Sequence, residues 1–426
     1  MKFTKICVLG MGYIGLPTSS TFASRKIHVS GVDVNEKVID SLQRGELHII
    51  EAGLQPLMLE AINTGFLSFS RKVSAADAFI IAVPTPFKED KLADMKYVVS
   101  AAESILPHLS KGNLVVLEST SPPRTTVDLV APILERSGLK AGVDFFLVYS
   151  PERVLPGQIL QELINNARVI GGVNRESAEA GRDLYATFVK GDIILTDATT
   201  AEMVKLMENT YRDINIAAAN EFSRLADRFG IDIWEAISLA NRHPRVKILN
   251  PGPGVGGHCI SVDPWFLVES APDITPLISS ARKVNDSQPH FVLDWMERKL
   301  GKLTNKQICV LGLTYKPDVD DFRESPAIDV VKLLTAKGAI VKAYDPFTMR
   351  EPLNGIHPTR NLSEALENAD AAVILVPHNE IRNLNPSDFS TYPKLKVIFD
   401  TVNVTGSTKW SSTPIKINRL GANKPE

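Results

Sequence analysis

The sequence lacks the features that mark several classes of protein. It has only three cysteines in 426 residues, odd in number and widely spread, which argues against a disulfide framework and fits a reducing compartment. A formal net charge of −2 provides no basic face, so no nucleic-acid partner is expected. No uninterrupted apolar run approaches the roughly 20 residues of a membrane helix. What remains, 44% hydrophobic and 23% charged residues, is the composition of an ordinary globular protein.

The beginning of the chain shows no targeting signal. The residues Met1-Lys-Phe-Thr-Lys lead directly into a short apolar run at 6–9, without the longer apolar stretch and small-residue cleavage site of a secretory peptide. We therefore expect a cytoplasmic protein without a membrane partner. Because 426 residues are too many for one core, two or three domains are expected.

Short apolar runs alternate with helical patterns in the first third of the chain, and the pattern restarts near residue 307. Continuous apolar strands that alternate with helices are typical of a parallel sheet covered on both faces. Strands are expected at 6–9, 29–32, 79–83, 115–117 and 146–149, and again at 308–311, 340–344, 372–376 and 397–399. The polar tail after residue 405 is expected to be poorly ordered.

The middle of the chain is predicted to be helical. Ala, Glu, Leu and Met recur at helical spacing over 199–241, with no glycine or proline before Gly230. A loop rich in proline and glycine follows at 250–257, and then a further helical stretch at 279–300. The predicted fold class is therefore α/β: two Rossmann-like doubly wound parallel-sheet domains, at 1–198 and 301–426, joined by a central helical domain at 199–300.

The two α/β halves share a short sequence echo. Ile6-Cys-Val-Leu-Gly10 recurs as Ile308-Cys-Val-Leu-Gly312, and Val32-Asp33 corresponds to Tyr344-Asp345. Either both halves begin a nucleotide-binding unit with the same strand and turn, or the first strands of such units simply look alike.

The first strand is followed by a dinucleotide-binding pattern. Gly10-x-Gly12-x-x-Gly15 lies between a predicted strand and a predicted helix, where glycines permit a tight turn and a close approach of the backbone to a pyrophosphate. Asp33 ends the second strand, where a carboxylate accepts the ribose hydroxyls. Because that carboxylate would repel a 2′-phosphate, NAD is favoured over NADP. A structural turn without a cofactor is the alternative.

Two threonines follow the carboxyl ends of later strands. Thr85 lies in Val83-Pro-Thr-Pro86 and Thr120 in Glu118-Ser-Thr120. Ligands of open parallel sheets bind at that edge, so both are candidates for lining the nicotinamide side. The alternative for each is an ordinary turn or cap residue.

One cysteine differs from the other two. Cys7 and Cys309 lie inside apolar strands and are read as inert core residues. Cys259 follows the glycine-rich loop, with Asp263 just beyond it. A nucleophilic thiol needs an exposed, polar site, which this segment can provide. A buried structural cysteine is the alternative.

A predicted helix carries a polar stripe. Lys205, Asn209 and Arg212 are spaced i, i+4 and i+7 and therefore share one face. Most such stripes are solvated, but the surrounding apolar residues at 203–207 favour a partly buried cleft. A lysine there can hold or accept a proton, and an asparagine can stabilise a developing oxyanion.

With these motifs in order, the sequence resembles the UDP-glucose/UDP-N-acetylmannosamine dehydrogenase family over nearly its whole length. The matching stretches lie at 10–15, 118–122, 151–157, 201–209, 256–263 and 315–326. The stretches at 241–246 and 251–265 look like the UDP-N-acetyl-D-mannosamine 6-dehydrogenase branch. Enzymes that act on UDP-glucose usually carry a lysine where this chain has Val262.

The resemblance implies an NAD-dependent homodimer that oxidises UDP-N-acetyl-D-mannosamine at C6 to the uronate, for surface polysaccharide precursor synthesis. It implies a cysteine thiohemiacetal and then a thioester on Cys259. Lys205 would be the acid/base, with Asn209 beside it. Asp263 would help activate or orient the water, and Glu152 would assist hydrolysis. The domain at 1–198 would then bind NAD and that at 301–426 the UDP-sugar.

The binding residues follow in the same way, and no metal ligand is expected. The cofactor-binding residues are Gly10, Gly12, Tyr13, Ile14, Gly15, Asp33, Thr85, Thr120 and Arg323. The substrate-binding residues are Arg153, Val154, Lys205, Asn209, Arg212, His243, Arg245, Gly256, Tyr315 and Lys316. Among these, the basic side chains Arg153, Arg245 and Lys316 are suited to the diphosphate charge.

Two other hypotheses stay open at this point. The same chemistry could act on UDP-N-acetylglucosamine or UDP-glucose. A different class, a catalytically inactive NAD-binding regulatory protein, is disfavoured because Cys259, Lys205 and Asn209 are all present. The long amphipathic helices of the middle need a partner to cover them, which favours a homodimer.

Overall fold

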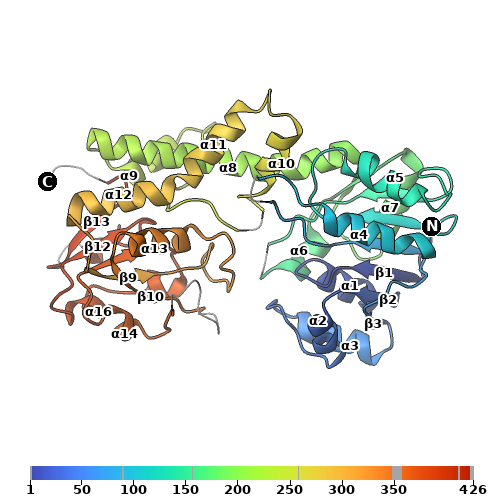
Figure 1. Ribbon diagram of the computed structural model, residues 1–426, viewed down its shortest axis with the longest axis horizontal. Helices are drawn as coiled ribbons and strands as arrows, with labels where there is room; N and C mark the ends of the chain where they lie inside the picture. The colour runs from blue at the N-terminus through green and yellow to red at the C-terminus, as the bar shows by residue number, and fades with distance from the viewer. Residues whose placement is uncertain are drawn as a thin grey trace. The chain divides into compact units, whose positions relative to one another are not determined.

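A computed structural model describes residues 2–88, 91–155, 157–257, 259–347, 357–410 and 413–422 (Figure 1). The chain forms two compact units: the first comprises residues 1–208 and 265–272, and the second 209–264 and 273–426. Each unit contains one sheet of mainly or wholly parallel strands, and a helical region lies between the two sheets in the sequence, so the predicted α/β fold class is confirmed. Within the described ranges, no helix is long and apolar enough to cross a membrane.

The first sheet has eight strands in the order β3-β2-β1-β4-β5-β6-β7-β8. They are β1 (Lys5–Leu9), β2 (His28–Val32), β3 (Leu67–Ser70), β4 (Ala78–Ile81), β5 (Leu114–Leu117), β6 (Phe146–Tyr149), β7 (Arg168–Gly172) and β8 (Ile193–Asp197). All five strands expected here are confirmed, whereas β3, β7 and β8 were not predicted. Neighbouring strands are parallel except β6 and β7, which are antiparallel. The direction of winding reverses between β1 and β4, which is where such sheets bind ligands.

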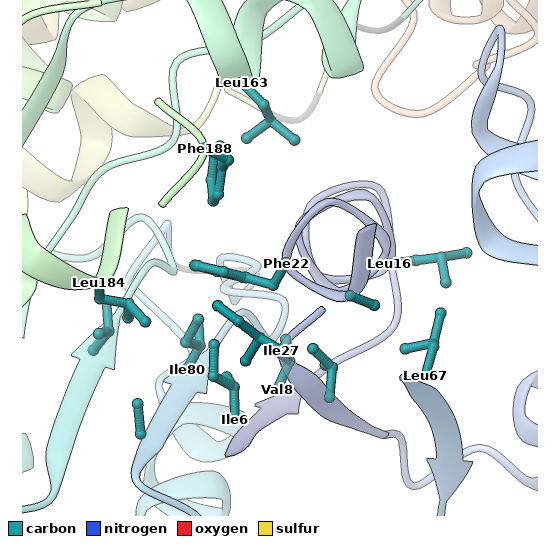
Figure 2. Packing of buried hydrophobic residues seen from close by; sticks show 14 of the residues in the cluster. Ile6, Val8, Leu16, Phe22, Ile27, Leu67, Ile80, Leu163, Leu184 and Phe188 are labelled. Atoms are coloured by element: carbon teal, nitrogen blue, oxygen red, sulfur yellow. The ribbon is translucent and has the colours of Figure 1, made fainter. Parts of the chain in front are cut away.

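Helices cover both faces of this sheet because its strands are apolar on both sides. Ile6 and Val8 point to one face, with α1 (Gly15–Ser24), α2 (Glu36–Gln43), α3 (Leu54–Asn63), α6 (Ile159–Asn165) and α7 (Arg175–Tyr185). Figure 2 shows this face, with Phe22 of α1 lying over Ile6, Val8 and Ile80. Cys7 and Leu9 point to the other face, with α4 (Lys96–Ile105), α5 (Ala131–Glu135) and the start of α8.

The predicted helical middle consists of one long helix and several shorter ones. They are α8 (Ala198–Phe229), α9 (Ile233–Ala240), α10 (Asp263–Ser270), α11 (Pro276–Asp286) and α12 (Gln288–Leu300). The single helical stretch expected at 279–300 is in fact two helices that meet at Ser287. Pro289 lies in the first turn of α12, where its missing N–H and its clash with the preceding residue favour a new start over a continuous helix.

The second sheet has five parallel strands in the order β10-β9-β11-β12-β13. They are β9 (Gln307–Leu311), β10 (Ile340–Tyr344), β11 (Ala371–Ile374), β12 (Val397–Asp400) and β13 (Lys416–Arg419). One face packs against α12 and α13 (Pro326–Ala336), and the other against α14 (Leu362–Leu366), α15 (Asn379–Arg382) and α16 (Ser387–Ser390). All four expected strands are confirmed.

The prediction of a poorly ordered tail is wrong for the residues that the structure describes there. β13 adds an edge strand to the second sheet, and Trp410, Ile415 and Leu420 are buried. A few well-spaced apolar residues were enough to fix this segment because it pairs along β12. Residues 411–412 and 423–426 lie outside the described ranges.

The sequence echo between the halves corresponds to a repeated structure. Leu9 is opposite Val32 in the first sheet, and Leu311 is opposite Tyr344 in the second. In each case the next residue along the outer strand is an aspartate that accepts hydrogen bonds from the turn: Asp33 from the Met11 N–H at 2.9 Å, and Asp345 from the Leu313 N–H at 2.7 Å. Both halves therefore begin with the same strand–turn unit.

Candidate active site

The carboxyl edge of the first sheet gathers most of the residues predicted to bind a cofactor. The glycine turn follows β1, Asp33 follows β2, Thr85 lies four residues after β4, and Thr120 and Glu152 follow β5 and β6. Because these five strands are parallel, their carboxyl ends meet at one edge of the sheet. Asp33, Thr85 and Thr120 are half-buried there.

Each of the three glycines in the turn is required for a different physical reason. Gly10 has a φ of +96° and lies so close to the Ala82 carbonyl that a side chain would collide with it. A Cβ on Gly15 would collide with the Gly10 carbonyl oxygen. A Cβ on Gly12 would meet no protein atom within 4 Å, so at that position the bare backbone faces open space. α1 then begins at Gly15 without a capping side chain on Ile14, so the positive end of its dipole lies directly at this turn, where it favours an anion.

The acid at the end of β2 completes a cradle that fits NAD. The Asp33 carboxylate accepts the Met11 N–H at 2.9 Å and the Asn35 N–H at 2.8 Å, which fixes it beside the turn. Both oxygens retain a lone pair for ribose hydroxyls. Tyr13 and Ile14 are half-buried within the turn.

In the second unit, the aspartate that corresponds to Asp33 is Asp345, and it pairs with a histidine side chain of the protein. Asp345 is buried, and its Oδ2 lies 3.2 Å from the His378 Nε2. The other ring nitrogen, Nδ1, accepts the Asp318 N–H at 2.9 Å, so the ring holds the loop that follows β9. The repeated turn is therefore closed by a histidine in the second unit, whereas the first unit leaves Asp33 accessible.

A buried ionic cluster, which sequence reasoning missed, lies at the carboxyl edge of the first sheet. Arg168 donates to Glu152 at 2.5 Å, to Ser150 at 3.0 Å and to Glu118 at 3.3 Å. The Tyr185 hydroxyl donates to Glu118 at 2.5 Å. No local pattern in the sequence could have revealed the cluster. Its members are spread over positions 118–185, and none of them stands in a run of residues that marks an ionic site.

One carboxyl of this cluster has a strongly altered acidity. Burial raises the pKa of Glu118 from its ordinary value of 4.5 to about 7, against the opposing attraction of Arg168 and with a further increase from Glu152. Its Oε2 is buried and has no hydrogen-bond partner among the described residues. Near neutral pH, Glu118 is therefore poised between its neutral and charged forms.

The predicted polar stripe on α8 is not a solvated face at its first two positions. Lys205 and Asn209 are each 9% exposed, whereas Arg212 is exposed. The Asn209 side-chain amide donates to the buried Asp263 carboxylate at 2.5 Å. This hydrogen bond joins α8 to the start of α10, four residues beyond the cysteine.

The three cysteines fall into two groups. Cys259 is exposed, whereas Cys7 and Cys309 are buried. Burial raises the pKa of both the Cys7 and the Cys309 thiol, which makes them poor nucleophiles. The Cys259 carbonyl accepts hydrogen bonds from the N–H groups of Val262 and Asp263. Cys259 therefore lies in the turn that leads into α10. Cys259 is therefore the accessible thiol of the chain.

The loop before Cys259 is fixed against two neighbours. The Gly252 N–H donates to the Asn220 side chain of α8 at 2.9 Å. A Cβ on Gly257, which has a φ of +87°, would collide with the Tyr315 ring, and one on Gly256 would collide with the Glu324 carbonyl. The glycines thus let the loop lie directly on the segment that follows β9.

The remaining predicted substrate residues are distributed over several segments. Tyr315 and Lys316 are half-buried after β9, and Gly256 lies close to that segment. His243 and Arg245 are exposed in the loop after α9, where the Arg245 N–H approaches the His243 Nδ1. The structure thus brings Tyr315 to the cysteine loop within the second unit, with Lys316 next to it in sequence, and leaves His243 and Arg245 on a separate exposed loop.

Three further predicted residues already have defined surroundings. Arg153 pairs with Glu208 of α8 at 2.8 Å and also donates to the Ala167 carbonyl. Val154, next to it, packs at the edge of the first core. Arg323, assigned to the cofactor by resemblance, lies in the second unit, where its guanidinium pairs with Asp321 at 2.6 Å.

The glycine turn after β1, with Asp33 at the end of the neighbouring strand β2, indicates a dinucleotide-dependent dehydrogenase. The second unit presents one accessible thiol, Cys259. Comparison with known proteins makes the class specific. Three domains of the UDP-glucose/GDP-mannose dehydrogenase family match in order: the NAD binding domain at residues 4–189, the central domain at 199–287 and the UDP binding domain at 309–407.

Full-length relatives agree with this match. A UDP-N-acetyl-D-mannosamine dehydrogenase of Methanocaldococcus jannaschii is 47% identical over 99% of this chain and 97% of its own. An NDP-N-acetyl-D-galactosaminuronic acid dehydrogenase of Ralstonia solanacearum is 45% identical, over 94% and 96%. A solved UDP-N-acetyl-mannosamine dehydrogenase of S. aureus superposes with a TM-score of 0.90 at 46% identity, covering 99% of both chains.

The chain therefore belongs to the UDP-glucose/GDP-mannose dehydrogenase family. It is an NAD-dependent nucleotide-sugar dehydrogenase whose first domain binds the cofactor and whose last domain is the UDP binding domain. The predictions of the family, of an enzyme and of NAD as cofactor are confirmed.

The turn glycines provide a test of the cofactor site. Gly12→Ala places a methyl group where no protein atom lies, so stability should stay within about 0.5 kcal/mol of the unchanged protein. The same methyl blocks the approach of a pyrophosphate and should weaken NAD binding by about tenfold or more. In Gly15→Ala the added methyl group collides with the Gly10 carbonyl, so this variant, unlike Gly12→Ala, should lower stability by about 1–3 kcal/mol. Calorimetric titration and denaturant unfolding measure both; an unchanged NAD affinity in Gly12→Ala would contradict this assignment.

The acidity of Glu118 predicts a pH-dependent stability. Because the folded-state pKa is raised, its stabilising contribution is complete below about pH 4.5 and is lost as the pH rises through about 7. Relative to Glu118→Gln, the natural protein should lose up to about 3 kcal/mol of unfolding free energy between pH 4.5 and 8. Glu103→Gln, which removes an exposed glutamate paired with Arg136, is the matched control. Parallel pH profiles for the natural protein and Glu118→Gln would refute the shift.

Proposed function

We propose that the protein oxidises the C6 hydroxymethyl group of UDP-N-acetyl-D-mannosamine to a carboxylate, consuming two NAD for each sugar. The observation that carries the proposal is the single accessible thiol, Cys259, on a loop that is anchored to α8 and to the segment after β9. Oxidation from alcohol to acid removes four electrons, and a thiol can hold the aldehyde between the two oxidations.

The first oxidation needs a base for the hydroxyl proton. NAD, held by the glycine turn and Asp33, supplies the hydride acceptor for both oxidations. Lys205, almost buried on α8, accepts the proton and its ammonium form then steadies the sugar oxygen. Asn209, one turn further along the helix, donates a second hydrogen bond to the same oxygen.

Cys259 then forms and releases the covalent intermediate. Its sulfur adds to the aldehyde carbon to give a thiohemiacetal, and the second oxidation leaves a thioester. Water attacks the acyl carbon, the carbon–sulfur bond breaks, and the thiolate of Cys259 is regenerated as the acid leaves. Asp263, which the Asn209 amide holds in place, orients this water, and Glu152 accepts its proton.

The substrate assignment rests on the basic residues and on the relatives. Lys316, Arg153 and Arg245 would neutralise the diphosphate. The relatives of Methanocaldococcus jannaschii and S. aureus are named for UDP-N-acetylmannosamine, which supports that sugar for this chain. The product would then be a precursor of surface polysaccharide. The other contacts proposed for the substrate are Val154, Arg212, His243, Gly256 and Tyr315, and those proposed for the cofactor include Tyr13, Ile14, Thr85, Thr120 and Arg323.

We further propose a functional division at 1–198 for NAD, 199–300 for the catalytic helix and cysteine loop, and 301–426 for the UDP-sugar. The ranges of the three matched family domains support this division. We place the reaction in the cytoplasm, because catalysis at Cys259 requires a reduced thiol.

A homodimer formed through α8 is part of the proposal. Tyr211, Phe222, Leu225 and Phe229 are exposed, and their spacing puts them on one face of the helix. A row of large apolar side chains on one helix face is typical of a surface that another protein covers. A second copy of the chain presents the same row and can cover it.

A panel of UDP-sugars tests the function. With UDP-N-acetylmannosamine, the enzyme should produce two NADH per sugar and the corresponding uronate. Cys259→Ala should abolish formation of the acid while NAD binding stays nearly unchanged, because the thiol is not part of the glycine cradle. Absorbance of NADH and chromatography of the product measure both. Turnover with UDP-glucose alone would remove the substrate assignment, and an unchanged yield of acid from Cys259→Ala would remove the covalent route.

Charged substitutions on α8 test the dimer. The double variant Phe222→Glu, Leu225→Glu puts two carboxylates into the apolar row and should convert a dimer into monomers, because burying unpaired charges is costly. Light scattering after size-exclusion chromatography gives the mass. Arg228→Glu, an exposed position beside the row, is the control and should stay dimeric. A monomeric natural protein, or an unaffected double variant, would contradict the proposal.

A further inference from the structure

The one antiparallel pair in the first sheet has a chemical consequence. In a wholly parallel sheet, every strand would begin at the edge opposite the cofactor. β7 runs against β6, with Val148 opposite Gly172 and Tyr149 opposite Gly171. Continued past the end of β6, this register sets Arg168, the first residue of β7, opposite Glu152. The reversed strand therefore places its first side chain at the edge of the sheet where β1 to β6 end.

Arg168 contacts Glu152 in a setting that leaves it little freedom. Its side chain is 4% exposed, and its guanidinium lies 4.2 Å from the centre of the Tyr185 ring. One nitrogen, Nη2, donates to Glu152 at 2.5 Å, while Nη1 donates to Ser150 and Glu118. A planar guanidinium held by a ring face and by three oxygens has one orientation, which a lysine could not reproduce.

Glu152 is held from two sides. Its Oε2 accepts Arg168, and its Oε1 accepts the Arg153 N–H at 2.7 Å. Its side chain is 8% exposed, so the carboxylate is almost buried but keeps a small solvent-accessible surface. Removal of Arg168 would leave two glutamates facing each other without the cation between them, and Glu152 would lose both its partner and its orientation.

We propose that Arg168 is a positioning residue for the hydrolytic step: through its ion pair it holds the Glu152 carboxylate where that group accepts a proton from the attacking water. The inference rests on the proposed function of Glu152. In this step the water oxygen bonds to the acyl carbon of the thioester, its proton passes to Glu152, and the carbon–sulfur bond breaks to release the Cys259 thiolate. In this role Arg168 acts on the reaction through the carboxylate of Glu152.

This role predicts which step fails when Arg168 is replaced. Both oxidations precede the hydrolysis, so Arg168→Met should still form two NADH per active site in a rapid first phase. Steady turnover should then fall by about tenfold or more, because proton transfer to a positioned carboxylate is lost. The acyl group should accumulate on Cys259. Arg168→Lys, which keeps the charge but not the planar fork, should lie between Arg168→Met and the natural protein.

The experiment mixes each variant rapidly with NAD and UDP-N-acetylmannosamine, follows NADH, and weighs the acid-quenched protein by mass spectrometry. Leu184→Ala is the matched control, because it opens the core of the same unit without touching Glu152. Glu152→Gln should accumulate the same adduct, and the double variant Arg168→Met, Glu152→Gln should be no slower than Glu152→Gln alone.

The outcomes separate the two proposals. An adduct in the Arg168 variants and none in Leu184→Ala supports the positioning role. Equal slowing of both phases with no adduct, as general loss of structure would cause, overturns it. If instead the natural protein yields no acid from any UDP-sugar, or Cys259→Ala still yields it, the proposed function itself fails.

Discussion

A row of buried hydrogen bonds along α8 fixes the segment that carries Cys259. At one end of that segment, Asn220 accepts the Gly252 N–H, and at the other, Asn209 holds the Asp263 carboxylate. Between these two points of the helix, Asp213 pairs with the buried Arg282 of α11 at 2.5 Å. Because these side chains are desolvated, each lost partner would leave an unsatisfied polar group inside the protein. The position of the segment that carries the thiol therefore depends on α8 as well as on the residues that follow β9.

The two sheets show how one architecture serves two purposes. Both begin with the same strand, turn and aspartate, yet His378 occupies the aspartate of the second sheet, whereas Asp33 remains accessible in the first. In the second unit the same ring fixes the loop after β9, on which the cysteine loop packs. The repeated strand–turn unit thus forms the cofactor site in one sheet. In the other sheet it fixes the loop on which the cysteine loop packs. The family match assigns these copies to NAD and to UDP.

Much of this fold could be predicted from the sequence, because most of the strands expected in advance are buried apolar runs. Four strands were not predicted: β3, β7, β8 and β13. β8 begins with the apolar run Ile-Ile-Leu but is only partly buried, whereas the other three have different compositions. β3 is the half-polar Leu-Ser-Phe-Ser, β7 contains arginine and two glycines, and β13 is an edge strand with alternating polar residues. Their pairing partners, rather than their own sequences, make them strands.

The candidate site divides in the same way. The glycine turn, Asp33 and the distinction between Cys259 and the other two cysteines could be read locally, since each depends on a short run of residues. The contacts of Arg168 could not, because they arise only when a strand reverses direction and brings residues 50 and 16 positions apart into contact. The roles carried over by resemblance, such as those of His243 and Arg323, remain predictions.

The most direct test is a crystal structure of Cys259→Ala with NAD and UDP-N-acetylmannosamine bound. We expect the sugar C6 to lie within about 3.5 Å of both the nicotinamide C4 and the place of the missing sulfur, as a reactive arrangement requires. We also expect Lys205 and Asn209 to contact the oxygen on C6. A sugar bound with C6 far from residue 259, or a nicotinamide held away from it, would contradict the covalent mechanism.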